Sequence, residues 1–176
     1  DERCSYFFSS AVGKRVVENV DAVLIQRHQD ALLGEFQVLL DEDLLDCQAD
    51  MYKVISRVPS IVKSFAAVFE KYCYKKGRES LDENKKDVKS FVSAALTVDE
   101  KMRKILNVNF KHDHHFDNAL KKACREFLNV KGFESAYNIA SYTDQLMKRT
   151  SKDQMIESDR EAPLDQIIHL LAYLED

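Results

Sequence analysis

Glycine and proline are scarce in this sequence. The 176 residues include 4 Gly and 2 Pro, whereas average usage would be roughly 12% for the two together. Hairpin turns depend on residues that tolerate positive φ, chiefly glycine. A sandwich, a barrel or another hairpin-rich β fold is therefore strongly disfavoured.

Long apolar runs and blocks of like charge are also missing. No stretch approaches the 18 apolar residues of a membrane helix, and the chain opens on Asp1-Glu2-Arg3 rather than on a signal peptide. We therefore expect no membrane association. The 26 basic and 30 acidic residues give a net charge of −4, and because no long basic block occurs we expect no nucleic-acid partner.

The cysteines form no dense pattern. Cys4, Cys47, Cys73 and Cys124 lie far apart, with no C-x-x-C pair, which indicates reduced thiols and a cytoplasmic and nuclear location. The content of 45% hydrophobic and 32% charged residues is typical of a globular protein with a sizeable core. The last apolar segment stops at 175–176 without a helix stop signal, so we expect a piece truncated at both ends.

Helical periodicity is present from end to end. Apolar residues at spacings of three, four and seven predict one helix over about 12–40 with a bend at Gly34. A second helix is predicted over about 42–57, with Leu45, Met51, Val54, Ile55 and Val58 inward, ending before Pro59. A third, over about 60–76, is expected to stop at Gly77.

The second half continues the pattern after a predicted loop at 78–89. Apolar stripes predict helices from about 88 to 110, from about 115 to 131 and over about 136–147, then a polar loop at 150–162 and a final helix after Pro163. No strand is predicted, so the expected fold is all-α. The expected core includes Phe36, Met51, Tyr52, Phe65, Phe69, Phe91, Phe116, Leu120, Phe127 and Tyr173.

One polar cluster could carry chemistry. His112, Asp113, His114 and His115 are consecutive, with Cys124 further on and His28 and His169 elsewhere. Adjacent His and Asp occur in metal-dependent phosphohydrolases, but no zinc-finger, ribbon or H-E-x-x-H spacing is present. We favour Asp113 as the N-cap of the following helix.

Two other sets have simpler interpretations than catalysis. The carboxylates of Asp41, Glu42, Asp43 and Asp46 lack the spacing of a calcium loop and are interpreted as helix-capping residues. Cys73 and Cys124 fall on apolar faces, where a thiol behaves as a small hydrophobic group. We therefore predict no catalytic, cofactor-binding or metal-ligating residue and no cofactor.

Basic residues gather at two places. One set interleaves with Tyr72 and Tyr74 but also with carboxylates, which indicates a solvated mixed-charge surface; it comprises Lys71, Lys75, Lys76, Arg78, Lys85 and Lys86. Lys121, Lys122 and Arg125 form a small basic helix face. We expect exposed helix surface there, with a partner contact as the alternative.

The order of several motifs resembles that of the cullin family. LLD at 39–41 followed by MYKVISRV at 51–58 is similar to the cullin pattern "LLD … MY.L.SR", and FDNALKKACREFLN at 116–129 is similar to "F..AL.KA...F.N". The end, LDQIIHLLAYLED at 164–176, is similar to the cullin stretch ending "FKYIEDKD", and Glu2, Arg3, Tyr6 and Phe7 resemble an "EER…YL" opening. The segment 133–149 departs from the family by lacking a proline.

The resemblance implies an antiparallel helical bundle of cullin-repeat type, stacked along an elongated stalk. Residues 1–80 would be the later part of one repeat, and residues 81–176 the following repeat. It also implies a non-catalytic scaffold of a ubiquitin ligase, spacing a substrate-receptor module from a RING module, both bound mainly outside this chain. A helical-rod tether of the vesicle-docking type and the metal-dependent phosphohydrolase remain as alternatives.

Overall fold

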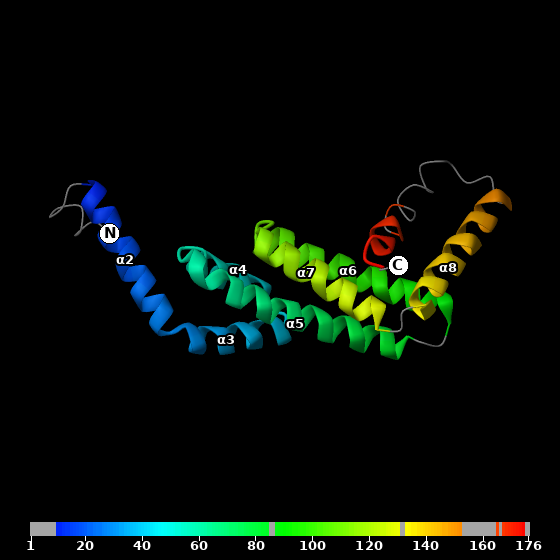
Figure 1. Cartoon of the computed structure of the whole chain (residues 1–176), viewed down its shortest axis with the longest axis horizontal. Helices are drawn as coiled ribbons and strands as arrows, with labels where there is room; N and C mark the ends of the chain where they lie inside the picture. Colours follow the sequence, from blue (N-terminus) through cyan, green and yellow to red (C-terminus); the bar gives the residue numbers. More distant parts are fainter. Residues whose placement is uncertain (1–9, 85–86, 131–132, 153–164, 166, 175–176) are drawn as a thin grey trace.

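The protein is an elongated array of α-helices, as seen in a computed structural model of the chain (Figure 1). The structure describes residues 10–84, 87–130, 133–152, 165 and 167–174. These residues contain helices and no strand, which confirms the predicted all-α fold. None of the described helices is both long and apolar enough to cross a membrane. The helices are α2 Ser10–Arg27, α3 Gln29–Asp41, α4 Leu45–Ile55, α5 Pro59–Glu83, α6 Val88–Asn109, α7 His114–Asn129 and α8 Phe133–Lys152.

Helix α5 is the centre of the packing. It contacts α3, α4, α6 and α7, and α6 also contacts α4, α7 and α8. Helices α5, α6 and α7 alternate in direction along the long axis, because each is joined to the next by a short turn (Figure 1). The two ends differ from this centre: α2 slants away at one end and α8 at the other.

The long helix predicted over 12–40 is wrong in one respect, because the chain bends at His28 and not at Gly34. His28 has φ −106° and ψ 14° and separates α2 from α3. The flanking Gln26 and Gln29 donate side-chain hydrogen bonds to Ser60 and Ser64 of α5, at 3.2 and 3.1 Å. These contacts with α5 accompany the change of direction at His28, whereas Gly34 is exposed on α3 with open space beside it.

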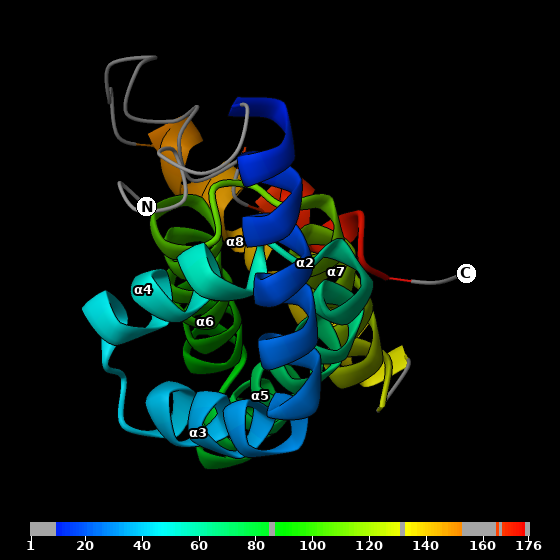
Figure 2. The ribbon, with the colours of Figure 1, turned by 90° about the vertical axis from the view of Figure 1, so that its left-hand side faces the viewer.

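Val20, Val23 and Leu24 belong to the apolar pattern of the predicted helix, but they are not buried as that pattern predicts. Val20, Val23 and Leu24 are 50%, 63% and 53% exposed, while Ile25 is buried in the core and Ala22 is partly buried against it. The view from the α2 end shows this helix in front of the packed helices rather than among them (Figure 2). Apolar residues at helical spacing indicate an amphipathic helix, but the pattern does not indicate whether another helix covers the apolar face.

Gly77 does not end the third helix. Helix α5 continues to Glu83, so most of the loop predicted at 78–89 is helical. A Cβ at Gly77 would fall within 2.7 Å of ring carbons of Phe127, which shows that this glycine allows close packing of α5 on α7. Helix α6 then begins at Val88, with the Asp87 carboxylate accepting from the Ser90 N–H at 2.9 Å. The division into repeats at residues 80 and 81 stays a prediction; α5 covers both sides of it.

The core is aromatic and joins α3 to α7. Phe110 and Phe116 stack with ring centroids 4.2 Å apart, and Phe36, Tyr52 and Phe69 contact one or both of these rings. The predicted core is confirmed as buried for Phe36, Tyr52, Phe65, Phe69, Phe91, Phe116, Leu120, Phe127 and Tyr173, while Met51 is half-buried at its edge.

Two inward assignments on the second predicted helix are wrong. Leu45 and Val54 are 42% and 39% exposed, whereas Gln48, which the apolar pattern passes over, is fully buried. Gln48 donates from Nε2 to the Leu39 carbonyl at 2.9 Å and accepts from Asn109 Nδ2 at 2.9 Å. A buried amide needs such partners, so α4 is oriented by hydrogen bonds as well as by apolar contact.

The C-terminal part agrees in outline with the expectation. Helix α8 extends to Lys152, so residues 150–152 are helical rather than part of the predicted polar loop. The rest of that loop and Pro163 lie outside the described residues. Residues 167–171 are helical, and Ile167, Leu170 and Tyr173 are buried against the core.

Candidate functional site

The turn between α6 and α7 is held in an uncommon backbone conformation. Lys111 and His112 have φ of 50° and 57°, the left-handed region that residues other than glycine seldom adopt. Phe110 on one side and Phe116 on the other are fully buried and stacked, so the ends of the turn are fixed by the core. This arrangement places the next residue, Asp113, at the start of α7.

Asp113 caps α7, as predicted. Its Oδ1 accepts from the His115 backbone N–H at 2.8 Å, and its Oδ2 accepts from the Tyr52 hydroxyl of α4 at 3.0 Å. Burial acts to raise the pKa of Asp113, but these hydrogen bonds outweigh it and the net pKa is lowered. Burial, followed by the Asp113 contact, raises the pKa of Tyr52 to about 12.

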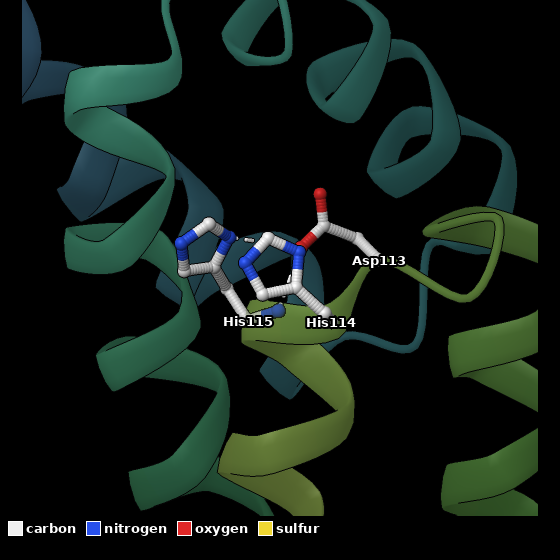
Figure 3. Close-up of side chains that lie close together, drawn as sticks. All are labelled: Asp113, His114 and His115. Atoms are coloured by element: carbon white, nitrogen blue, oxygen red, sulfur yellow. Dashed lines mark hydrogen bonds and ion pairs between the residues drawn. The ribbon is translucent and has the colours of Figure 1, made fainter.

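Two imidazoles gather beside this carboxylate. His115 Nδ1 lies 3.2 Å and His114 Nδ1 4.0 Å from Asp113 Oδ1. Figure 3 shows the two rings side by side at the first turn of α7, with the carboxylate facing them, and their centroids are 3.7 Å apart. Within the described parts of the chain, these three residues form the one group of potential metal ligands, with all donor atoms within 4.8 Å of one another.

The other members of the suspected phosphohydrolase site are not assembled. Cys124 is fully buried on α7 beside Asp99, with Sγ 3.9 Å from Oδ1, and burial raises the pKa of its thiol. Cys73 is also buried, and burial raises its pKa. His28 lies at the bend between α2 and α3, while His169 borders a groove on α6. No His and Asp set from several helices converges among the described residues, so the structure does not support the phosphohydrolase alternative.

The acidic residues of the segment 41–46 act only in part as helix-capping residues. Asp46 lies in the first turn of α4, as predicted, but the N-cap is Leu44, which makes no side-chain cap. Asp43, at φ 54°, instead accepts from Lys101 Nζ of α6 at 2.7 Å and from the Tyr72 hydroxyl of α5 at 3.0 Å. The hydrogen bond from Lys101 is the main cause that lowers the pKa of Asp43. The sequence could not show this link, because its partners are 29 and 58 residues away.

Five of the predicted basic residues pair with carboxylates. On α7, Lys121 contacts Asp117 at 2.6 Å and Lys122 contacts Glu70 of α5 at 2.7 Å. Lys75, Lys76 and Arg78 of α5 pair in the same way with Asp41, Glu79 and Asp82. The predicted mixed-charge surface is present on these helices, while Lys85 and Lys86 lie outside the described residues.

A polar cluster that the sequence did not predict fixes the C-terminal segment. Arg103 of α6 donates from Nε to Asp99 at 2.7 Å and from its guanidinium to the Tyr173 hydroxyl. Asn129 of α7 donates to the Tyr173 carbonyl at 2.9 Å. Tyr173 was predicted only as a core residue; the signal for its second role is an Asp and Arg four residues apart on the buried side of α6.

Comparison with known proteins accounts for this architecture. The family model described as the cullin alpha solenoid domain matches residues 1–176. Cullin-1 of Dictyostelium discoideum is 25% identical over 99% of this chain, and Cullin-1 of Caenorhabditis elegans is 27% identical over 100% of this chain. The chain spans 24% of the length of each of these relatives. Cullin-2 of Caenorhabditis elegans is 28% identical over 97% of the chain, which spans 22% of that protein.

These matches support neither a vesicle tether nor a hydrolase. They agree with the order of motifs at 39–58 and 116–129 and with the helical array that those motifs form. The match of all 176 residues to the family model, together with the observed stack of helices, shows that this chain belongs to the cullin family.

Proposed function

We propose that this chain is a rigid, non-catalytic spacer in a cullin-RING ubiquitin ligase. In this proposal the substrate receptor and the RING protein bind mainly outside these 176 residues. The segment fixes the distance between them, which raises the effective concentration of the substrate lysine near the charged enzyme. The proposal places the protein in the cytoplasm and nucleus; Cys47, Cys73 and Cys124 form no disulfide among the described residues.

The observation that carries the proposal is the continuity of the core. Aromatic rings from α3, α4, α5, α7 and the turn between α6 and α7 are in contact in one cluster, so these elements cannot move independently without separating buried surfaces. Polar links between distant helices add to this, such as Asp43 with Tyr72 and Lys101. A segment built in this way resists bending and would hold the modules bound at its two ends at a fixed separation.

The test is a ubiquitin-transfer assay in a full-length cullin that carries this segment. A flexible Gly-Ser insertion at the α7–α8 junction, after Val130, should loosen the stalk while leaving each helix intact. The control is an insertion of the same length after Lys152, where α8 ends. Binding of the receptor and of the RING protein is measured by pulldown for both insertions.

We expect the α7–α8 insertion to lower the rate of substrate ubiquitination at least fivefold with both binding partners retained, and the control to leave it unchanged. If the loosened stalk, verified by small-angle scattering, still transfers ubiquitin at the original rate, the spacer role is wrong. If neither binding partner is retained by the unaltered protein, the assignment to this class of ligase is wrong.

A further inference from the structure

We propose that Asp113, His114 and His115 bind a divalent transition-metal ion, for which Zn²⁺ is the natural probe. The inference does not depend on the spacer role and goes beyond the absence of metal ligands that the sequence led us to expect. It starts from the three side chains that Figure 3 shows at the first turn of α7.

The donor set suits zinc. Two imidazole nitrogens and one carboxylate oxygen are ordinary zinc ligands, with bonds of about 2.0–2.2 Å. In a tetrahedral site with such bonds, two ligand atoms are about 3.3 Å apart. The His115 Nδ1 to Asp113 Oδ1 distance of 3.2 Å already has this value. An ion between the two atoms binds the neutral tautomer of His115, in which Nδ1 has a free lone pair and the ring proton is on Nε2.

The third ligand can close onto the same ion. His114 Nδ1 is 4.0 Å from Asp113 Oδ1, and its side chain is 76% exposed, so its ring can turn without disturbing the core. The exposed side of His114 leaves room for water as a fourth ligand. Three protein ligands and one water is a coordination that zinc adopts in proteins.

The carboxylate is held in place by the surrounding structure. Tyr52 donates to Oδ2 and the His115 backbone N–H donates to Oδ1, so Asp113 cannot rotate away from the imidazoles. Partners of this kind orient the ligands of metal sites and raise their affinity. The charge of Asp113 also offsets the partial positive charge of the α7 N-terminus, which would otherwise oppose a cation.

A bound ion would hold the Asp113 carboxylate, which links α7 to α4 through Tyr52. Asp113 and both histidines belong to the start of α7, whereas Tyr52 belongs to α4, so an ion on the carboxylate also reinforces the link between these helices. Because a preformed site binds only in the folded state, the ion stabilises the protein by an amount that grows with the logarithm of the free ion concentration above the Kd.

The test is calorimetric titration of the whole 176-residue chain with ZnCl₂ after treatment with a chelator. The test variants are His114→Ala, His115→Ala and Asp113→Asn, the last of which keeps one oxygen for the cap and places an NH2 group beside the Tyr52 hydroxyl. The matched controls are His112→Ala, the adjacent histidine outside the cluster, and His169→Ala. Circular dichroism verifies that each variant is folded.

We expect one equivalent of Zn²⁺ to bind, with a rise of about 5 °C in the melting temperature at saturation. Each test variant should weaken binding at least tenfold, and both controls should match the original chain. Absence of saturable binding would overturn the proposal. So would binding that survives in a His114→Ala, His115→Ala double variant, or that His112→Ala removes to the same extent.

Discussion

Two glycines show how much depends on the surroundings of a single residue. Gly34 and Gly77 both lie inside helices, yet only Gly77 is packed against another side chain, the Phe127 ring. The sequence alone predicts a bend at Gly34 and a helix end at Gly77, and the structure shows neither. A glycine after two lysines has the pattern of a C-terminal cap, and nothing local reveals that a phenylalanine 50 residues later requires the space.

We predict opposite effects of alanine at these two positions. Gly34→Ala should stabilise the protein by about 0.5–1 kcal/mol, because a helix interior favours alanine and no atom lies within 4 Å of the new Cβ. Gly77→Ala should destabilise it by about 1–3 kcal/mol through overpacking. Urea unfolding followed by circular dichroism measures both, and equal free energies for the two variants would contradict the assignment.

The buried amide pair of Gln48 and Asn109 provides a second test at this scale. Asn109→Ala leaves Gln48 Oε1 without its donor and should cost about 1–3 kcal/mol. Replacing both by leucine should cost less than this single change, because the Leu39 carbonyl still accepts from the Leu44 N–H. A double-mutant cycle measures the coupling, and additive single effects would show that the two amides act independently.

At the scale of elements, amphipathic periodicity was a good guide to which segments are helical. It predicted α6 and α7 closely, including the cap at Asp113, because capping is a local property. It was poorer where a long-range contact decides, as at His28, whose neighbours bind α5, and at Asp43, whose partners lie on α5 and α6. The cluster of His114 and His115 with Asp113 was visible as consecutive residues, but the role of Tyr52 was not.

Because Asp113 caps α7, the free energy of unfolding should depend on pH in the acidic range. The folded state lowers the pKa of Asp113, so its stabilising effect is fully present above the unfolded value near 4 and is lost as the pH falls through the lower folded value. We expect Asp113→Asn to cost about 1–2 kcal/mol at pH 7 and less at pH 3, where the carboxylate begins to be protonated.

Urea unfolding at the two pH values checks this expectation. Asparagine keeps the cap acceptor, so the comparison separates the cap itself from the charge of Asp113 and its contact with Tyr52. Asp43 and Asp87, whose pKa values are also lowered, are the same in both proteins and contribute equally to their acid sensitivity. A difference between the two proteins that is the same at pH 3 and pH 7 would contradict a role for the ionised carboxylate.

For the whole molecule, packing is concentrated between α3 and α7 and is thinner at the two ends. Helix α2 contributes Ile25 to the core, while Val20, Val23 and Leu24 are exposed. We therefore predict that amide hydrogens of α2 exchange at least tenfold faster than those in the middle of α5. Hydrogen exchange read by mass spectrometry tests this, and equal protection of both helices would show that α2 unfolds only with the rest of the chain.

The bend at His28 gives α2 the mechanical properties of a lever. An 18-residue helix is about 27 Å long, so a rotation of roughly 10° at His28 moves its far end by about 5 Å. Two glutamine side chains, Gln26 and Gln29, are the hydrogen-bonded contacts that hold this pivot on α5. Substituting either one would therefore change the reach of the molecule while leaving its core intact.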